Sequence, residues 1–561
     1  MTARPRWLRA AVVAMVVGVV ALGAGLGACT HGNGSGSGPG RAGASTSSTT
    51  AGARGPTAGG PPGTIRLGVP EEPASLDPFD PRSRTLAGAA ILGQVLPQLF
   101  RVDPAGREEG WLVDDATVRV AADGRSAAFS VRTGARWSDG PPITADDLRF
   151  TLDTVRGGAW PGPRAGYDRL TAVDGTGPEV TLRFAGPFPG WRRLFSGADV
   201  VLPAHRLAGK DLRAEWMQGP DLSGGPFRLG PVTPGLSVRL ERNDAWWGPP
   251  ARAAVIEVLV VPDVRTMEQL LSRGDLDAAW PPATSNRVGR FRALAGVDVS
   301  VAEPGGTLEA LVANTTTVPA DRRRAWLGLA NRDRFVAVLL AGEAEPAVSL
   351  AGPPGAAAGP SGAPSGEVAG PSGAGTGPSA AGRTSAAVTA TATWASAGTE
   401  PAAGRLTGAG QTTLVSDDED ELGPLVGRVL QQGGQAAGAT LELKSDESTT
   451  VDGSWLPDGR FDLALQRTVA WPEPCWTCWF ADTATGRGNV TRVTGLTALA
   501  AAADADPAAV PALEARVKAE ALTLPLWRPR AVLAGRRVGG LVANSWSPGP
   551  FWTAEAWTPS R

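Results

Sequence analysis

The sequence predicts a mixed α/β or α+β body made of two or three packed lobes. Alternating apolar residues, typical of half-buried strands, occur at 65–69, 179–184, 236–241, 255–261 and 461–466. Helical apolar spacing recurs between these segments, and this mixed order excludes a helical bundle or a sandwich. A chain of 561 residues also exceeds one ordinary domain, so more than one hydrophobic core is expected.

The N-terminus has the features of an export signal. Arginines precede an apolar run at 11–28, which ends in Leu-Gly-Ala-Cys29 and resembles a bacterial lipobox. We expect a signal peptide at 1–28, lipidation of Cys29 and a flexible, Gly- and Ser-rich tether at 29–63. An uncleaved membrane anchor is the alternative. Either way, the body is expected on the extracytoplasmic face of the cell membrane.

Charge and histidine content argue against several function classes. Lys+Arg 53 against Asp+Glu 55 gives a formal net charge of −2, which does not favour nucleic acid as a partner. The two histidines, His31 and His205, are far apart in the sequence. A His-based metal cluster or catalytic pair is therefore hard to build, and we expect no metal site and no cofactor.

Several helices can be placed by periodicity and capping. We predict helices over 86–100 and 321–340, the second interrupted near Asn331. After a strand at 412–415, a helix is expected to start near Ser416, with Glu419 completing a capping box and Pro424 kinking the first turns. Residues 352–410 are rich in Gly, Pro, Ala and Ser and are interpreted as a low-complexity insert.

The block from Trp137 to Asp147 combines a turn with a helix start. Thr144 is a good N-cap, and Asp146 and Asp147 fall in the first helical turn, where carboxylates favour the helix dipole. Adjacent helix positions point in different directions, so capping explains this carboxylate pair better than acid–base chemistry does.

The densest group of pocket-forming side chains lies at 461–480. An alternating strand leads into Trp471-Pro472-Glu473-Pro474-Cys475-Trp476-Thr477-Cys478-Trp479-Phe480. Indoles at a strand end favour a ligand pocket, although they also fill hydrophobic cores. In an oxidising compartment the default for Cys475 and Cys478 is a disulfide; metal binding and thiol–disulfide exchange are the alternatives, and zinc would need more ligands.

Several blocks in the same order resemble the family 5 extracellular solute-binding proteins, the peptide/nickel receptors of ABC importers. The strongest block runs from Trp137 to Asp147 and resembles the pattern Trp-Ser-Asp-Gly-x-Pro-Val-Thr-Ala-Asp-Asp. The supporting blocks are Ser75-Leu76-Asp77-Pro78, Gly224-Gly225-Pro226-Phe227, Leu240-Glu241-Arg242-Asn243, Trp246-Trp247-Gly248, Asp275-Leu276-Asp277 and Leu524-Pro525-Leu526-Trp527.

The resemblance implies a two-lobed α/β fold like that of periplasmic binding proteins, with an extra subdomain in the N-terminal lobe. On that scheme lobe 1 comprises 64–299 and a return at 506–561, with its extra subdomain at 82–200. Lobe 2 comprises 300–505 and carries the insert. Closure of such lobes buries a ligand and presents a new surface to a permease.

The resemblance also gives candidate ligand contacts, namely Ser75, Asp77, Trp471, Glu473 and Trp476. Peptide-binding members carry an Asp that holds the free amine of the peptide, and Ala470 aligns with that position. Because a buried ammonium without a carboxylate is costly, ordinary oligopeptides are less favoured, unless Glu473 substitutes.

The function implied is non-enzymatic uptake of a peptide-like or other small organic ligand. The expected partners are that ligand, ABC permease subunits and the membrane, through the lipid anchor; the protein itself is expected to be a monomer. The alternatives are a sensor or envelope chaperone on the same fold and, more distantly, a thiol–disulfide exchange enzyme that uses Cys475 and Cys478.

Overall fold

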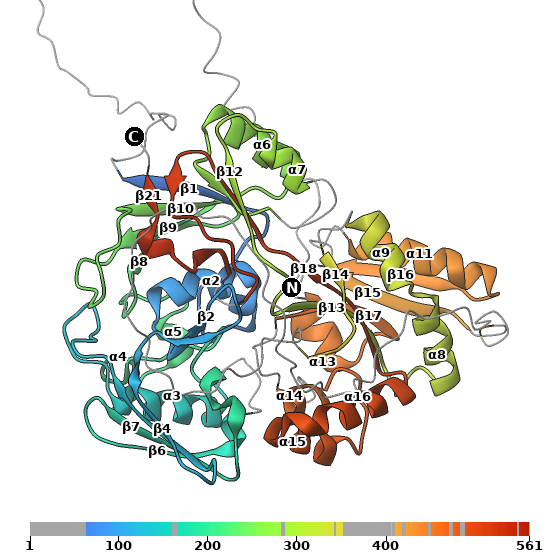
Figure 1. Ribbon diagram of the computed structural model, residues 1–561, viewed down its shortest axis with the longest axis horizontal. Helices are drawn as coiled ribbons and strands as arrows, with labels where there is room; N and C mark the ends of the chain where they lie inside the picture. The colour runs from blue at the N-terminus through green and yellow to red at the C-terminus, as the bar shows by residue number, and fades with distance from the viewer. Residues whose placement is uncertain are drawn as a thin grey trace, which may run out of the picture. The chain divides into compact units, whose positions relative to one another are not determined.

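The computed structural model describes residues 63–73, 75–159, 166–281, 287–340, 344–351, 406, 410–417, 422–446, 450–469, 475–482, 489–546 and 549–559. The predicted signal peptide, the lipidation site Cys29, the tether except for residue 63, and nearly all of the insert lie outside these residues. Within them, the expected mixed α/β architecture is confirmed, with two large sheets that form the centres of two lobes (Figure 1).

The first large sheet has seven strands and combines the first strand of the described chain with a strand from its C-terminal part. Its order is β12 (Asp298–Val301), β19 (Val532–Gly535), β11 (Ala278–Ala279), β1 (Thr64–Val69), β10 (Val255–Val260), β9 (Ser237–Arg242) and β8 (Phe227–Thr233). Strand β1 runs parallel to β10 and β11. The alternating apolar residues that predicted β1 are buried, since Ile65, Leu67 and Val69 are at most 1% exposed.

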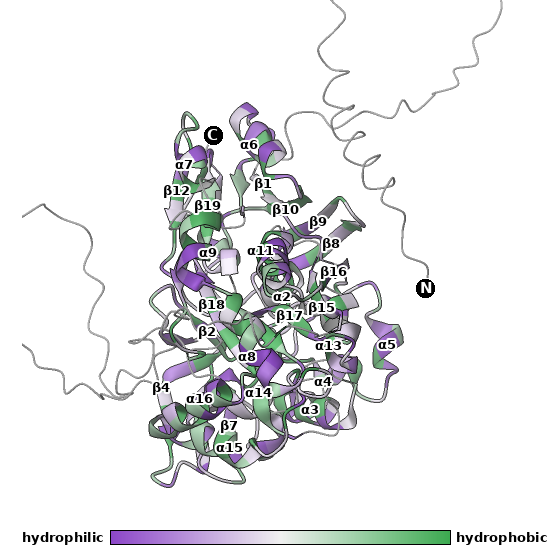
Figure 2. Cartoon of the chain, turned by 90° about the vertical axis from the view of Figure 1, so that its right-hand side faces the viewer, coloured by the Kyte–Doolittle hydropathy of each residue, from purple (hydrophilic) through white to green (hydrophobic). Residues whose placement is uncertain are grey.

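The second large sheet has six strands. Its order is β14 (Ala344–Pro346), β18 (Thr523–Pro529), β13 (Thr307–Ala313), β17 (Leu463–Val469), β15 (Thr412–Asp417) and β16 (Leu441–Asp446). Strand β15 is parallel to β16 and β17, whereas β13 is antiparallel to β17 and β18. In Figure 2, β17 and β18 carry the hydrophobic colour, in keeping with the buried pattern of β18.

The chain returns to the first sheet later than expected. The sequence-based boundary at 506 assigns the whole C-terminal segment to lobe 1. In the structure, helix α16 (Val510–Ala519) contributes to the core of lobe 2 and β18 pairs with β13, so the first sheet is re-entered only at β19. The physical reason is that pairing with β13 buries the apolar strand β18 on both faces.

A smaller sheet of four strands lies within the N-terminal part. Its order is β4 (Val113–Val120), β5 (Ser126–Val131), β7 (Glu179–Phe184) and β6 (Leu170–Asp174), and helix α3 (Ala145–Gly157) contacts β6. Two short pairs complete the strands, namely β2 (Phe100–Val102) with β3 (Glu108–Gly110) and β20 (Val538–Gly539) with β21 (Thr558–Pro559).

The predicted helices differ from the observed ones mainly at their ends. Helix α2 (Leu86–Val95) stops before Phe100, because Pro97 disfavours a helical conformation at Leu96. The predicted helix over 321–340 is two helices, α8 (Ala320–Leu329) and α9 (Arg332–Leu339), as the interruption at Asn331 indicated.

The prediction of a helix start near Ser416 is wrong. Strand β15 continues through Ser416 to Asp417, and helix α11 (Gly423–Ala436) begins six residues after the strand. Pro424 therefore lies in the first turn, where proline is tolerated, and does not kink the helix. Glu419 lies outside the described residues.

The remaining helices and helical turns connect the strands. They are η1 (Pro81–Arg84), η2 (Tyr167–Arg169), η3 (Pro189–Arg193), α4 (Ala204–Leu207), α5 (Leu212–Glu215), α6 (Val264–Arg273), α7 (Arg287–Arg292), η4 (Val451–Trp455), α13 (Leu456–Asp458), α14 (Trp476–Phe480), α15 (Thr497–Ala505), η5 (Pro507–Ala509), η6 (Gly549–Phe551) and η7 (Ala554–Ala556). Among the helices of the described residues, none has the length and apolar character needed to cross a bilayer.

Candidate functional site

The candidate site is formed by charged groups at strands of both large sheets. Glu71 follows the carboxyl end of β1 in the first sheet. Asp417 ends β15 in the second sheet, and Arg467 lies near the carboxyl end of β17. Both of these residues act electrostatically on Glu71. Ligands of open α/β sheets usually bind outside the carboxyl ends of parallel strands, which makes this position the natural candidate.

Glu71 is held at the start of helix α2. Its carboxylate accepts hydrogen bonds from the side chain of Thr85 and the main-chain N–H of Ala87. Thr85 is also the N-cap of α2, so the carboxylate lies at the positive end of the helix dipole. Although the residue keeps some exposed surface, its carboxylate is enclosed, and burial raises the pKa of Glu71 to about 7, against the opposing effect of the Arg467 guanidinium.

Arg467 is fixed from its own sheet by Glu309. The two residues are direct cross-strand partners on β17 and β13, and their side chains form an ion pair. Glu309 is buried, whereas the Arg467 side chain is 39% exposed. Arg467 is thus a positioned cation that still has surface available to a ligand.

This arrangement suits binding better than bond chemistry. It brings carboxylates and a guanidinium together, which can recognise a polar ligand through charge-assisted hydrogen bonds. Within the described part of the chain, no group of three or more His, Cys, Asp and Glu side chains could hold a metal ion.

Two predicted ligand contacts, Ser75 and Asp77, organise the loop after β1. The Asp77 N–H donates to Ser75 Oγ at 3.1 Å, and Asp77 Oδ1 accepts from the Phe79 N–H at 2.8 Å. Asp77 is 7% exposed, and burial raises its pKa to about 6. These contacts give the two residues a role in loop structure, and their contact with a ligand stays a prediction.

The Trp-rich stretch is described only in part. Trp471 and Glu473 lie outside the described residues. Trp476 opens helix α14 and is 1% exposed in the core of lobe 2, where its ring meets Trp479 edge-on at 5.5 Å. The main-chain N–H of Trp476 donates to Asp504 Oδ1 at 2.7 Å. Its predicted ligand contact is untested and would require this part of the core to open.

Cys475 is disulfide-bonded in the structure. The side chain of Cys478 lies outside the described residues, so the pairing of these two cysteines stays a prediction.

Sequence reasoning missed Glu71, Arg467 and Glu309. A signal existed for Glu71, which lies two positions after the end of the first strand. For Arg467, the predicted strand stopped at Gln466, whereas β17 continues to Val469. The pairing of Arg467 with Glu309 joins residues 158 positions apart, which no local pattern reveals.

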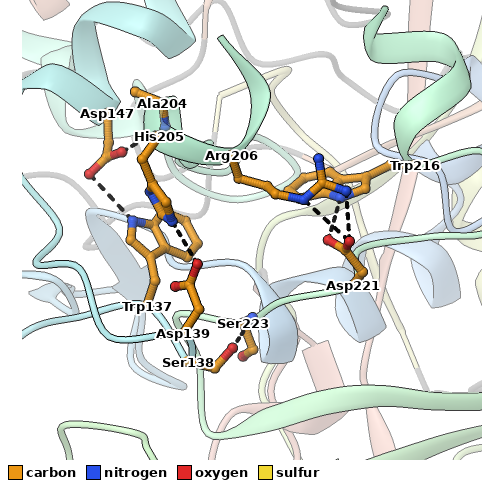
Figure 3. Close-up of polar contacts among 10 residues, drawn as sticks. All are labelled: Trp137, Ser138, Asp139, Asp147, Ala204, His205, Arg206, Trp216, Asp221 and Ser223. Carbon is orange, nitrogen blue, oxygen red and sulfur yellow. Dashed lines mark hydrogen bonds and ion pairs between the residues drawn. The ribbon is translucent and has the colours of Figure 1, made fainter. Parts of the chain in front are cut away.

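The strongest sequence block has a structural role (Figure 3). Thr144 and Asp147 form a capping box at α3, which confirms the capping interpretation of the carboxylate pair. Asp147 Oδ1 also accepts from the Ala204 N–H at 2.8 Å, and Oδ2 receives the Trp137 indole N–H at 3.4 Å. The Ser223 N–H donates to Ser138 Oγ at 3.0 Å. The block therefore joins α3 to the segment that follows the small sheet.

His205 and its neighbours extend this network. His205 Nε2 lies 2.8 Å from Asp139 Oδ2, on the same block. Arg206 pairs with Asp221 at 2.8 Å, and Asp221 also accepts the Trp216 indole N–H at 2.9 Å (Figure 3). The exposed histidine is thus part of a surface polar network that fastens two segments of lobe 1.

Comparison with curated proteins finds relatives that are binding proteins. The chain is 29% identical over 266 residues to a probable monoacyl phosphatidylinositol tetramannoside-binding protein, LpqW, of Mycobacterium tuberculosis. That alignment covers 45% of this chain and 41% of the relative, so the chain spans about two fifths of that protein. It is 25% identical over 218 residues to the oligopeptide-binding protein OppA of Mycobacterium bovis, covering 37% of this chain and 36% of OppA.

Solved structures match the fold over most of the chain. The oligopeptide-binding protein AppA of Bacillus subtilis, in complex with a nonapeptide, superposes with a TM-score of 0.72 at 16% identity, covering 89% of this chain and 99% of AppA. NikA of Brucella suis, in complex with Fe(III)-EDTA, gives 0.64 at 19% identity, covering 88% and 99%. These likenesses confirm the two-lobed binding-protein fold.

The family assignment rests on a match to a family model. The model described as bacterial extracellular solute-binding proteins, family 5 Middle, matches residues 108–489, which is more than half of the chain. The chain therefore belongs to the family 5 bacterial extracellular solute-binding proteins.

Proposed function

We propose that this protein captures a peptide-like or other small organic ligand between its lobes and delivers it to an ABC permease. The observation that carries the proposal is the approach of Arg467, from the second sheet, to Glu71, from the first. A ligand that bridges these groups would stabilise the closed arrangement of the lobes, and closure is the signal that such receptors offer to a permease.

The charges favour a ligand that is polar and carries both hydrogen-bond donors and acceptors. The Arg467 guanidinium favours a carboxylate or a phosphate-like group on the ligand, while Glu71 and Asp417 favour hydrogen-bond donors. Ala470, at the position where peptide receptors carry an amine-binding Asp, argues against ordinary oligopeptides as the main ligand. One relative is named for an oligopeptide and another for a glycolipid, so both ligand classes belong in a screen.

The proposal includes export and anchoring. Cleavage after residue 28, lipidation of Cys29 and a tether at 29–63 would hold the receptor on the extracytoplasmic face of the cell membrane. Intact-mass analysis of the membrane fraction is expected to give a diacylglyceryl adduct on the mature chain, which Cys29→Ala abolishes. An unprocessed chain of full mass would contradict this anchoring.

A ligand screen by thermal unfolding tests the binding function. Peptides, opines, sugars, metal chelates and glycolipid headgroups are added to the purified chain and to the variant Arg467→Ala. A true ligand at one hundred times its Kd should stabilise the wild type by about 2.7 kcal/mol. The shift should shrink in Arg467→Ala but persist in Arg460→Ala, because Arg460 is an exposed arginine that pairs with Asp458. An equal shift in both variants would contradict the role of Arg467.

A sensor or envelope chaperone is the second candidate function. The replacement of the amine-binding Asp by Ala470 and the insert at 352–410 favour it. Deletion of the gene distinguishes the two functions, since loss of uptake of the identified ligand, restored by the wild-type gene, supports transport. Unchanged uptake together with an altered envelope supports the second candidate.

A further inference from the structure

Asp504, near the end of α15, lies between two parts of the molecule. One part is the start of helix α14, which opens with the predicted ligand contact Trp476. The other is a pair of arginines, Arg169 and Arg193, from turns beside the small sheet of lobe 1. We propose that Asp504 is a positioning residue that links closure of the lobes to the first turn of α14.

On the side of lobe 2, Asp504 holds the first turn of α14. Oδ1 accepts from the Trp476 N–H at 2.7 Å, and Oδ2 accepts from the Thr477 N–H at 3.2 Å and from Thr477 Oγ1 at 2.5 Å. These N–H groups have no partner within the helix, so the carboxylate supplies the cap that the local sequence lacks. The disulfide-bonded Cys475 directly precedes this turn.

On the side of lobe 1, two guanidinium groups approach the same carboxylate. Arg169 Nη1 is 3.6 Å from Oδ2, and Arg193 Nη2 is 4.0 Å from Oδ1. Both guanidinium groups lie over the Phe188 ring, with centroid distances of 4.9 and 5.5 Å, and Arg169 also donates to the Pro187 carbonyl at 2.9 Å. Contacts within lobe 1 therefore position both guanidinium groups independently of Asp504.

Because Asp504 is buried, its charge depends on the two arginines of lobe 1 for compensation. Its side chain is 1% exposed, and a buried carboxylate needs compensating charge. At 3.6 and 4.0 Å the arginines act by charge more than by hydrogen bonding, so their effect depends on this dry environment. Separation of the lobes would move both cations away from Asp504 and expose its carboxylate to water. Water would then compete for the carboxylate, so its hydrogen bonds to the first turn of α14 would weaken.

The linkage is tested on the purified chain without any ligand. Hydrogen exchange is measured for the amides of Trp476 and Thr477, and the radius of gyration is measured by small-angle scattering. In the double variant Arg169→Gln with Arg193→Gln, neither substituted side chain touches these amides. We expect their exchange to accelerate about tenfold, as loss of part of a buried ion pair predicts, and the radius of gyration to increase.

Two further variants make the test decisive. Arg183→Ala removes an exposed arginine that pairs with Asp174 in the same small sheet and should match the wild type. Asp504→Ala removes both the cap and the charge and should accelerate exchange at least as much as the double variant. If Asp504→Ala accelerates exchange while the folded double variant behaves as wild type in both measurements, Asp504 is a helix cap alone and the linkage is refuted.

This inference rests on the proposed function in one respect, namely that closure of the lobes accompanies ligand binding. Because the experiment uses no ligand, a failed ligand screen and a failed exchange experiment are distinguishable. If Asp504→Ala does not fold, the double variant, which leaves the cap intact, still decides the question through the same two measurements.

Discussion

Replacing Glu71 with Gln should change how the stability of the protein depends on pH. The carboxylate of Glu71 is enclosed between the loop after β1 and the N-terminus of α2, and burial raises its pKa from an ordinary 4.5 to about 7. A group whose pKa is higher in the folded state binds its proton more tightly there. Ionisation therefore opposes folding, and stability falls as the pH rises from about 4.5 to about 7.

The magnitude follows from the two pKa values. Each pH unit between them costs at most about 1.4 kcal/mol, so the wild type loses up to about 3 kcal/mol across this interval through Glu71. Water that enters between the lobes would hydrate the carboxylate, which makes this figure an upper limit. Glu71→Gln has no such proton to lose, so the difference in stability between variant and wild type should grow across the interval and then level off.

Urea unfolding at a series of pH values measures this difference directly. The variant Arg467→Met is the second arm. Removal of the nearby cation should raise the pKa of folded Glu71 further, so the loss of stability should continue to higher pH. Parallel pH profiles for the wild type and Glu71→Gln would refute the burial of this carboxylate.

Three further predictions concern a helix cap, a close backbone approach and the disulfide. Asp147→Ala should lower the free energy of unfolding by about 2 kcal/mol, measured with urea, because it removes the capping box and the hydrogen bond to Ala204 in α4. The control Asp146→Ala should change it by no more than about 0.5 kcal/mol, and equal losses would contradict the capping role of Asp147. Gly225→Ala should destabilise the protein by about 1–3 kcal/mol, because the new Cβ would lie 2.3 Å from a main-chain oxygen of α2. The control Gly157→Ala places its Cβ in open space and should be neutral or stabilising. A neutral Gly225→Ala would refute the close approach of the two backbones. Peptide mapping without reductant should find the peptide of Cys475 lighter by two hydrogens, and Cys475→Ser should remove that difference; trapping of two free thiols would contradict the disulfide.

Local sequence patterns were reliable for elements whose signals are short-range. The alternation at 65–69 predicted β1, and the capping residues around Thr144 predicted the start of α3. The end of α2 before Pro97 could have been predicted from the same rules, since a residue before proline avoids the helical conformation.

Features that depend on long-range strand pairing could not be predicted from local sequence. Residues 523–529 join the second sheet through β13, more than two hundred positions earlier, so their lobe could not be read from their own sequence. The charged site has the same character, since Glu71 and Arg467 come from different lobes. Periodicity identifies a strand and its buried face, but the neighbours of a strand depend on competition among all strands.

Native mass spectrometry of the intact protein, purified without denaturation, tests the central claim most directly. If the protein is a solute receptor that binds at Glu71 and Arg467, the wild type should carry a small-molecule adduct that denaturation releases, and Arg467→Ala should lose most of it. The matched variant Arg460→Ala should retain the adduct. A bare mass for the wild type, even after incubation with an extract of its own cells, would contradict the account, as would an adduct that persists unchanged in Arg467→Ala.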